Sequence, residues 1–514
     1  MINLTLAILE ADKMNSQEKM IAEADSANNA PSLDEKIDNT ADKDERSQRP
    51  PSKKNNVDMT EGPFLKKMIL FAIPLILTGF LQSFYNAADL IVVNLFAQSD
   101  APLVGAIGCT SALTNLILGM FMGFSVGAGV LVAHYVGAKQ EKDVNVTLHT
   151  AILLSVISGL TIASVGVIFA EDMLRIMNTS AELLPYATLY LRIIFLGTPA
   201  SLLYNYIASM LRSSGDSKRP LIFLSISGFI NVVLNVFLVT VVKLDVAGVA
   251  IATISSQYVS AAMSLVYLMR KRGMLHFSFK RLRIDFKKLK RLLYIGVPSG
   301  IQGSLSALSN TLIQASMNLI DLNAEAGGHM INGFAASSNL EGFLYIAMHS
   351  LYSVALTFIG QNVGAKKYKN VKRLAFYSVG VVLAIGWIMG GLMMVFHKPL
   401  LSLYISDDKV AFSAAITRYS IIIPTYFLCG LVDTLCGTLR ALDRSLTSMV
   451  ISVTSTCGIR IIWINTIFSY FGTAESLFIA YPITWILCCA LHVVFIVSAT
   501  KKLLKKQNDE LLLE

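Results

Sequence analysis

The chain has 514 residues, of which 54% are hydrophobic and 15% charged, with a formal net charge of +9 and a mean hydropathy of +0.58. Because average soluble domains carry about 25% charged residues, this composition excludes a soluble multidomain enzyme, a disulfide-rich secreted protein and a disordered scaffold. It predicts an all-α integral membrane protein.

The first 62 residues differ from the rest of the chain, with 13 acidic and 8 basic side chains and few aromatic ones. Such a segment buries too little apolar surface to offset its chain entropy, so it is predicted to be a disordered cytoplasmic tail. Its only apolar run, residues 4–9, is too short for the hydrophobic region of a signal peptide and precedes acidic residues.

Twelve later stretches are long and apolar enough to cross a bilayer core, which needs roughly 20 residues of helix. In the first half they are residues 68–96, 103–131, 146–170, 183–211, 220–242 and 247–269. In the second half they are residues 289–320, 327–359, 374–396, 411–439, 448–470 and 476–499.

The loops between these spans alternate in charge. One side carries 28 lysines and arginines, and the other carries only Arg175, Lys243, Lys398 and Lys409. The positive-inside rule therefore predicts a multi-pass protein of the plasma or inner membrane with both termini cytoplasmic, and an even number of spans agrees. Since the basic residues lie in short loops without interleaved aromatics, no nucleic-acid partner is expected.

The two halves of the chain repeat the same short motifs. Residues 136–139 and 363–366 both read Val-Gly-Ala-Lys, and Pro74 and Asn86 recur 224 residues later as Pro298 and Asn310. Two six-helix lobes that both start on the cytoplasmic side are related by a pseudo-two-fold axis along the membrane normal, an arrangement suited to alternating access. The predicted organisation is a tail (1–62), an N-lobe (63–272), a basic cytoplasmic linker (273–291), a C-lobe (292–502) and a C-terminal tail (503–514).

A few polar residues fall within the first-half spans. Asp89 lies late in the first span, where a carboxylate away from bulk water can bind a proton or Na⁺, or can serve packing alone. Asn231 and Asn235 share one face of the fifth span, and Thr253 and Gln257 share one face of the sixth. Their oxygens suit a hard cation and equally suit hydrogen bonds between helices.

In the second half, Glu341 and Asp433 are the acids well inside spans, and Arg460 is the clearest buried base. Either acid could contact a cationic substrate or pair with Arg460. The histidines are interpreted as structural. No catalytic triad, zinc-protease motif, P-loop or Cys/His metal spacing occurs, so neither an enzyme nor an ATP-driven pump is predicted.

Several of these features together resemble the MATE family of multidrug and toxic compound extrusion transporters, within the MOP flippase superfamily. They are the proline-containing first span with Asp89, the Gly-Ala-Lys motif after the second span, and three further segments in the same order as in that family. These segments are residues 211–220 (Leu-Arg-Ser-Ser-Gly-Asp-Ser-Lys-Arg-Pro), residues 247–257 (Ala-Gly-Val-Ala-Ile-Ala-Thr-Ile-Ser-Ser-Gln) and residues 361–365 (Gln-Asn-Val-Gly-Ala). The likeness runs from about residue 64 to residue 502.

The resemblance implies a V-shaped, two-lobe exporter that exchanges amphipathic, cationic drugs or metabolites for Na⁺ or H⁺. It is expected to act as a monomer among membrane lipids, without a cofactor or a metal beyond possible Na⁺ at Asp89. Carried over residue by residue, the ion-coupling site is Asp89, Asn231, Asn235 and Thr253, with Asn235 standing where the family often has a carboxylate. The predicted substrate-cavity residues are Glu341, Asp433, Gln257 and Asn310, and Pro74 is the predicted gating kink.

Two other functions stay open at this point. One is a lipid-linked oligosaccharide flippase of the same superfamily, which would need a strongly basic cavity for a pyrophosphate. The other is a membrane scaffold or receptor that transports nothing.

Overall fold

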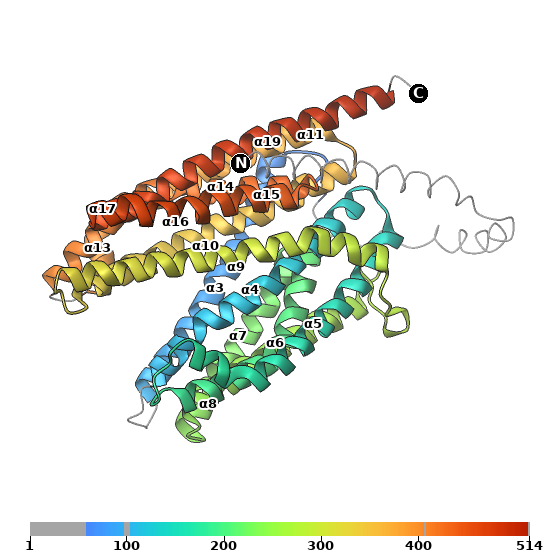
Figure 1. Ribbon diagram of the computed structural model, residues 1–514. Helices are drawn as coiled ribbons and strands as arrows, with labels where there is room; N and C mark the ends of the chain where they lie inside the picture. The colour runs from blue at the N-terminus through green and yellow to red at the C-terminus, as the bar shows by residue number, and fades with distance from the viewer. Residues whose placement is uncertain (1–57, 97–102, 406–407, 512–514) are drawn as a thin grey trace. The chain divides into compact units, whose positions relative to one another are not determined.

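The computed structural model describes residues 58–96, 103–405 and 408–511, and every regular element in these ranges is a helix (Figure 1). The predicted all-α fold is therefore confirmed. The first-half helices are α3 (Phe64–Phe96), α4 (Leu103–Gly137), α5 (Glu141–Ile176), α6 (Leu184–Ser213), α7 (Lys218–Val236), η1 (Phe237–Val241) and α8 (Asp245–Arg270). After the short η2 (Phe279–Arg281), the second-half helices are α9 (Phe286–Asn323), α10 (His329–Gly364), α11 (Tyr368–Val395), α12 (His397–Ser402), α13 (Lys409–Ile422), η3 (Ile423–Thr425), α14 (Phe427–Ala441), α15 (Ser445–Ser452), η4 (Val453–Gly458), α16 (Ile459–Trp463), η5 (Ile464–Phe468), α17 (Ser469–Phe471), α18 (Ala474–Phe478) and α19 (Ala480–Leu511).

Each of the twelve predicted spans coincides with one of these helices or with a run of consecutive helices. Within the described residues, ten helices are long and apolar enough to cross a membrane, and α13 and α14 make an eleventh span with a 44° bend. The predicted span at residues 289–320 coincides with α9, which has 38 residues but falls outside that set. The reason is chemical, because α9 carries Gln302, Ser306, Asn310 and Gln314 on a face that lines a cavity.

The helices of each half pack mainly with one another. In the first half α5 lies along α6, α6 lies along α4 and α8, and α3 lies along α7; in the second half α10 packs against α11, α13 and α14. Figure 1 shows α5 to α8 gathered away from α11, α14 and α19. The halves meet where α4 packs against α9 and α10, and where α3 packs against α10.

The repeated Val-Gly-Ala-Lys motifs form the same helix end twice. Lys139 and Lys366 both have positive φ values, 59° and 55°, and the preceding amides of Ala138 and Ala365 each donate a 2.9 Å bond to the carbonyl four residues back. The sequence repeat is thus a repeat of backbone conformation.

These two helix ends also contact each other reciprocally. A Cβ on Gly137 would overlap the carbonyl oxygen of Gln361, and a Cβ on Gly364 would overlap the carbonyl oxygen of His134. The partners in both contacts are related by the same offset of 227 residues, as a pseudo-two-fold axis requires. Glycine is needed at both positions because the two backbones touch.

The contact between α4 and α9 is equally close. A Cβ on Gly123 would overlap the backbone of Gly300, and a Cβ on Gly296 would lie 2.7 Å from the Cα of Phe124. Small residues allow helix backbones to approach in this way, which is how helices associate in a bilayer that offers no hydrophobic driving force.

The predicted N-terminal tail ends in a packed segment. Residues 1–57 lie outside the described part of the chain, whereas Met59 is fully buried and its carbonyl accepts a 2.8 Å bond from the Asn362 side chain of α10. Glu61 pairs with Lys367 at 2.7 Å. At the other end, α19 stays helical to Leu511, through most of the predicted C-terminal tail.

Candidate ion and substrate sites

Asp89, on α3, lies at the centre of a buried polar cluster in the first half. Its carboxylate accepts hydrogen bonds from the Asn235 side-chain amide and, at 3.0 Å, from the Thr253 hydroxyl. Asn231 completes the cluster, because its Oδ1 accepts from the Asn235 amide at 3.3 Å and its own amide donates to Thr253 Oγ1 at 3.4 Å. The structure therefore brings together all four residues of the predicted ion-coupling site.

Local packing explains why Asp89 faces α7. One turn earlier on α3, the Tyr85 ring lies directly against Gly228 of α7, where no side chain blocks it. The Tyr85 hydroxyl donates a 2.7 Å bond to the Leu224 carbonyl. Asp89 follows Tyr85 by four residues and Asn235 follows Gly228 by seven, so each pair shares one helix face and Asn235 lies beside Asp89.

The Asp89 cluster is rich in oxygen and almost closed to solvent. Asp89, Asn231 and Asn235 are 8%, 3% and 0% exposed, and the buried Oδ1 atom of Asn235 finds no hydrogen-bond partner in the described part of the chain. A carboxylate beside amide and hydroxyl oxygens is the ligand chemistry that a hard cation prefers. The same carboxylate could instead take a proton.

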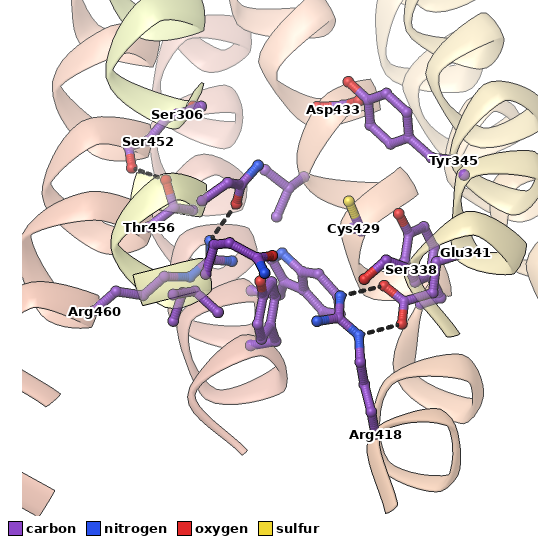
Figure 2. Close-up of a pocket in the computed structure, with 18 of the residues that line it drawn as sticks. Ser306, Ser338, Glu341, Tyr345, Arg418, Cys429, Asp433, Ser452, Thr456 and Arg460 are labelled. Carbon is purple, nitrogen blue, oxygen red and sulfur yellow. Dashed lines mark hydrogen bonds and ion pairs between the residues drawn. The ribbon is translucent and has the colours of Figure 1, made fainter. Parts of the chain in front are cut away.

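A cavity of about 430 Å³ lies wholly within the second half. Its walls come from α9, α10, α13, α14, α15, η4, α16 and α19 (Figure 2). Three of the four predicted substrate residues, Asn310, Glu341 and Asp433, line it. Gln257 does not, because it lies in the first half with its Oε1 beside Gly197 of α6.

The pairing of charges in this cavity differs from the one the sequence suggested. Glu341 binds Arg418 through two 2.8 Å hydrogen bonds, and both side chains are nearly buried, at 8% and 6% exposure. Ser337 adds a 3.1 Å bond to Glu341. The sequence analysis did not single out Arg418, although a basic residue within the apolar stretch 411–439 could have indicated a buried ion pair.

The other acid also has a partner. Asp433 accepts a 2.9 Å bond from the ring of His349, which was interpreted as structural and is 52% exposed. Neither acid pairs with Arg460, so that alternative is wrong. Arg460 instead donates to Asn310 Oδ1 at 3.3 Å and lies 4.2 Å from the centre of the Tyr481 ring.

Pro74, the predicted gating kink, lies inside a helix that continues from Phe64 to Phe96. The Thr78 hydroxyl donates a 2.7 Å bond to the Pro74 carbonyl. Before Pro74, Met68 and Phe71 belong to the second-half core, where Phe71 meets Phe358 of α10 with ring centres 5.8 Å apart.

The MatE family profile matches residues 74–237 and 305–467, one match in each half of the repeat. The chain is 28% identical over 407 residues to "Probable multidrug resistance protein YoeA" of Bacillus subtilis, covering 77% of this chain and 85% of the relative. It is 27% identical over 410 residues to an "FAD transporter" of Shewanella oneidensis, covering 78% and 87%.

"Multidrug export protein MepA" of Staphylococcus aureus is 22% identical over 456 residues, covering 88% of this chain and 97% of the relative. Among solved structures, an outward-facing multidrug resistance MATE transporter of the MOP superfamily superposes with a TM-score of 0.81 at 18% identity, covering 89% of this chain and 100% of that one. A MATE protein in complex with MaL6 gives 0.78 at 20% identity, covering 88% and 99%. These structures share the fold.

Proposed function

Because this chain belongs to the MatE family of membrane transporters, we propose that it is a secondary active exporter that exchanges small amphipathic molecules for an inward-moving Na⁺ or H⁺. Transporters of this family are not enzymes and need no enzymatic cofactor, which confirms those two predictions. A multi-pass membrane protein with small-molecule substrates follows from the same match.

The observation that carries the coupling proposal is the cluster around Asp89. Asp89 is a single buried carboxylate with three neighbouring polar side chains. Binding a cation there is electrostatically favourable, because an unneutralised charge at this depth in the membrane is costly. Asn235 supplies an amide where many relatives are expected to have an acid, so one positive charge balances the site. One bound Na⁺ or one proton per cycle fits that balance.

The path of α3 supports a mechanism in which this ion moves the two halves. Residues of α3 from Met68 to Phe80, on both sides of Pro74, pack against the second half, and Tyr85 and Asp89 further along contact α7 and α8 in the first half. Binding and release of a cation at Asp89 change the packing of the later segment. Because one helix connects both cores, that change biases the contact between them toward inward or outward opening.

Small-molecule export is supported by the printed names of relatives, which describe multidrug resistance, multidrug export and FAD transport. The flippase alternative would predict several unpaired bases in the cavity. Of the two arginines that line it, Arg418 is neutralised by Glu341. We further propose a monomer in the plasma or inner membrane with both termini cytoplasmic, on the asymmetry of the basic loops.

Efflux from proteoliposomes tests the proposal. Purified protein is reconstituted with a fluorescent amphipathic dye, and a Na⁺ gradient, a pH gradient or neither is imposed. We expect one gradient to drive dye movement and Asp89→Asn to abolish it. Gradient-independent dye movement would contradict coupling. An inactive protein that moves fluorescent lipid between leaflets would favour the flippase.

A further inference from the structure

Arg460 is a buried cation that has no acidic partner among the described residues. It is 5% exposed, its Nε has no hydrogen-bond partner, and its bond to the neutral Asn310 amide is long at 3.3 Å. The two acids that line the same cavity, Glu341 and Asp433, are bonded to Arg418 and His349. Arg460 therefore has no acidic partner of its own among the described residues, and a buried guanidinium without one is costly unless a ligand offsets its charge.

The wall next to Arg460 is rich in donors and aromatic rings. Ser452 and Thr456 line the cavity along the helix that leads to Arg460, and Figure 2 shows them beside it. Ser452 is 2% exposed, and its hydroxyl has no hydrogen-bond partner within residues 58–96, 103–405 and 408–511. Tyr481, which stacks on Arg460, packs edge to face with Trp485 at 5.5 Å between ring centres. A guanidinium and hydroxyls suit a carboxylate or phosphate, and the rings suit a planar group.

The internal repeat gives an independent argument. The first-half run Ser227, Asn231, Asn235 has the same four-residue spacing as Ser452, Thr456, Arg460, at an offset of 225. Asn235 corresponds to Arg460 in this alignment. At the offset of 224 that relates Asn86 to Asn310, Asp89 corresponds to Ile313, which also lines the cavity.

The equivalent clusters in the two halves thus differ in the sign of their charged residue. The first-half cluster contains one acid and no base, and its second-half counterpart contains a base where the first half has an amide and isoleucine where the first half has the acid. The fold therefore places one acid in the first half and one base in the second half within pseudo-symmetric clusters.

We propose that the second-half cavity binds an organic anion, a carboxylate or phosphate carried on a planar aromatic group, with Arg460 as its counter-charge. This inference rests on the proposed export function and names its substrate class. It departs from the cationic substrate that the family resemblance implies. Arg460 and the Ser452 hydroxyl hold the anionic group, while Tyr481 and Trp485 contact the ring.

Equilibrium binding to the full-length protein, without any ion gradient, tests this with three planar tricyclic probes of different charge. Riboflavin 5′-phosphate is anionic, riboflavin is its neutral matched control, and proflavine is cationic. We expect the phosphate form to bind about 10-fold or more tightly than riboflavin, as one charge-assisted hydrogen-bonded contact provides, and proflavine to bind most weakly. Equal binding of the two flavins, or tightest binding of proflavine, overturns the proposal.

Variants then locate the charge. Arg460→Gln keeps a donor for Asn310 and is expected to lower riboflavin 5′-phosphate affinity to that of riboflavin, whose own affinity stays unchanged. Arg460→Lys should restore part of the preference, and Arg192→Gln, which alters an exposed base on α6, should keep all of it. A full preference in Arg460→Gln overturns the assignment. The comparison of probes on the native chain stands even if that variant does not fold.

The same measurement in nanodiscs identifies the source of the anion. If riboflavin 5′-phosphate binds equally well when phosphatidylglycerol is added to phosphatidylcholine nanodiscs, the ligand of the cavity is a soluble anion. If phosphatidylglycerol competes with riboflavin 5′-phosphate, the ligand is an anionic lipid headgroup. Both results support anion binding. The binding assay uses no ion gradient, so it is independent of the proposed coupling. Anion binding without ion-driven efflux would contradict the proposed export function and leave this inference standing.

Discussion

The side-chain amide of Asn235 donates a hydrogen bond to the carboxylate of Asp89, a residue 146 positions earlier in the chain. The contact joins α3 to α7 inside the first half, next to a second bond from Thr253 of α8. Three helices therefore meet at one carboxylate, so a change in its charge alters the packing of all three.

Asp89→Asn tests whether this charge matters. Asparagine has the same shape and keeps an oxygen that can accept the Thr253 bond, so we expect little change in thermal unfolding but complete loss of ion-driven efflux. Flux assays and thermal unfolding in detergent measure the two effects. Asp172→Asn, which removes an exposed carboxylate at the end of α5, is the matched control and should transport normally. Native flux in Asp89→Asn would remove Asp89 from the mechanism.

Thr253→Val tests the hydroxyl in the same cluster. Valine fills the same volume but cannot donate the 3.0 Å bond to Asp89 or offer an oxygen to a cation. A polar contact to a charged group is worth about 1.5–3 kcal/mol. If Na⁺ is the coupling ion, loss of this oxygen ligand should raise the Na⁺ concentration for half-maximal flux roughly 10-fold. If H⁺ is the coupling ion, loss of the bond to the carboxylate favours its protonated form, so half-maximal flux should be reached at a lower H⁺ concentration. Thr253→Ser retains the hydroxyl and should stay within about 3-fold of the native value, a spread typical of context effects. Similar ion dependence in the valine and serine variants would argue against a role for the oxygen.

The Glu341–Arg418 pair should matter mainly for stability. Glu341→Gln leaves the Arg418 guanidinium buried at 6% exposure without its counter-charge, at a cost of about 3–5 kcal/mol. The double variant Glu341→Gln with Arg418→Met removes both charges and should recover much of that loss. Denaturant or thermal unfolding of the three proteins measures it. If the single variant is as stable as the native protein, the pair contributes no net stability.

Gly123→Ala tests the close contact between the halves. The added methyl group overlaps the backbone of Gly300, so α4 and α9 must move apart, and we expect lower thermal stability and slower transport. Gly119→Ala, one turn earlier on α4, meets nothing within 4 Å and should be neutral or slightly stabilising, because alanine favours helix by about 1 kcal/mol. Equal behaviour of the two alanine variants would show that the contact is unimportant.

Hydropathy and helical spacing predicted much of this architecture, because both are local properties of the chain. Each predicted span coincides with a helix or a run of consecutive helices, and Asn231 and Asn235 share the face that their spacing indicates. The Val-Gly-Ala-Lys repeat is visible in the sequence, and in the structure it forms the same turn at the ends of α4 and α10. The glycine of each turn contacts the backbone of the other helix. Among the described helices that match predicted spans, α9 alone is not apolar enough to count as a membrane span by mean hydropathy, because its cavity-lining face carries polar residues.

Local sequence patterns were therefore enough to predict the membrane helices and the duplicated halves, and the family resemblance named Asp89 and the three polar residues around it. Which charges meet depends on how the helices pack. Arg418 meets Glu341 across 77 residues and His349 meets Asp433 across 84, whereas Arg460 meets no acid among the described residues. A helix pattern specifies which face a side chain occupies, but the partner on that face depends on which helix packs there and at what height. In the low dielectric of a membrane interior, that choice of partner sets whether a cavity is neutral or charged.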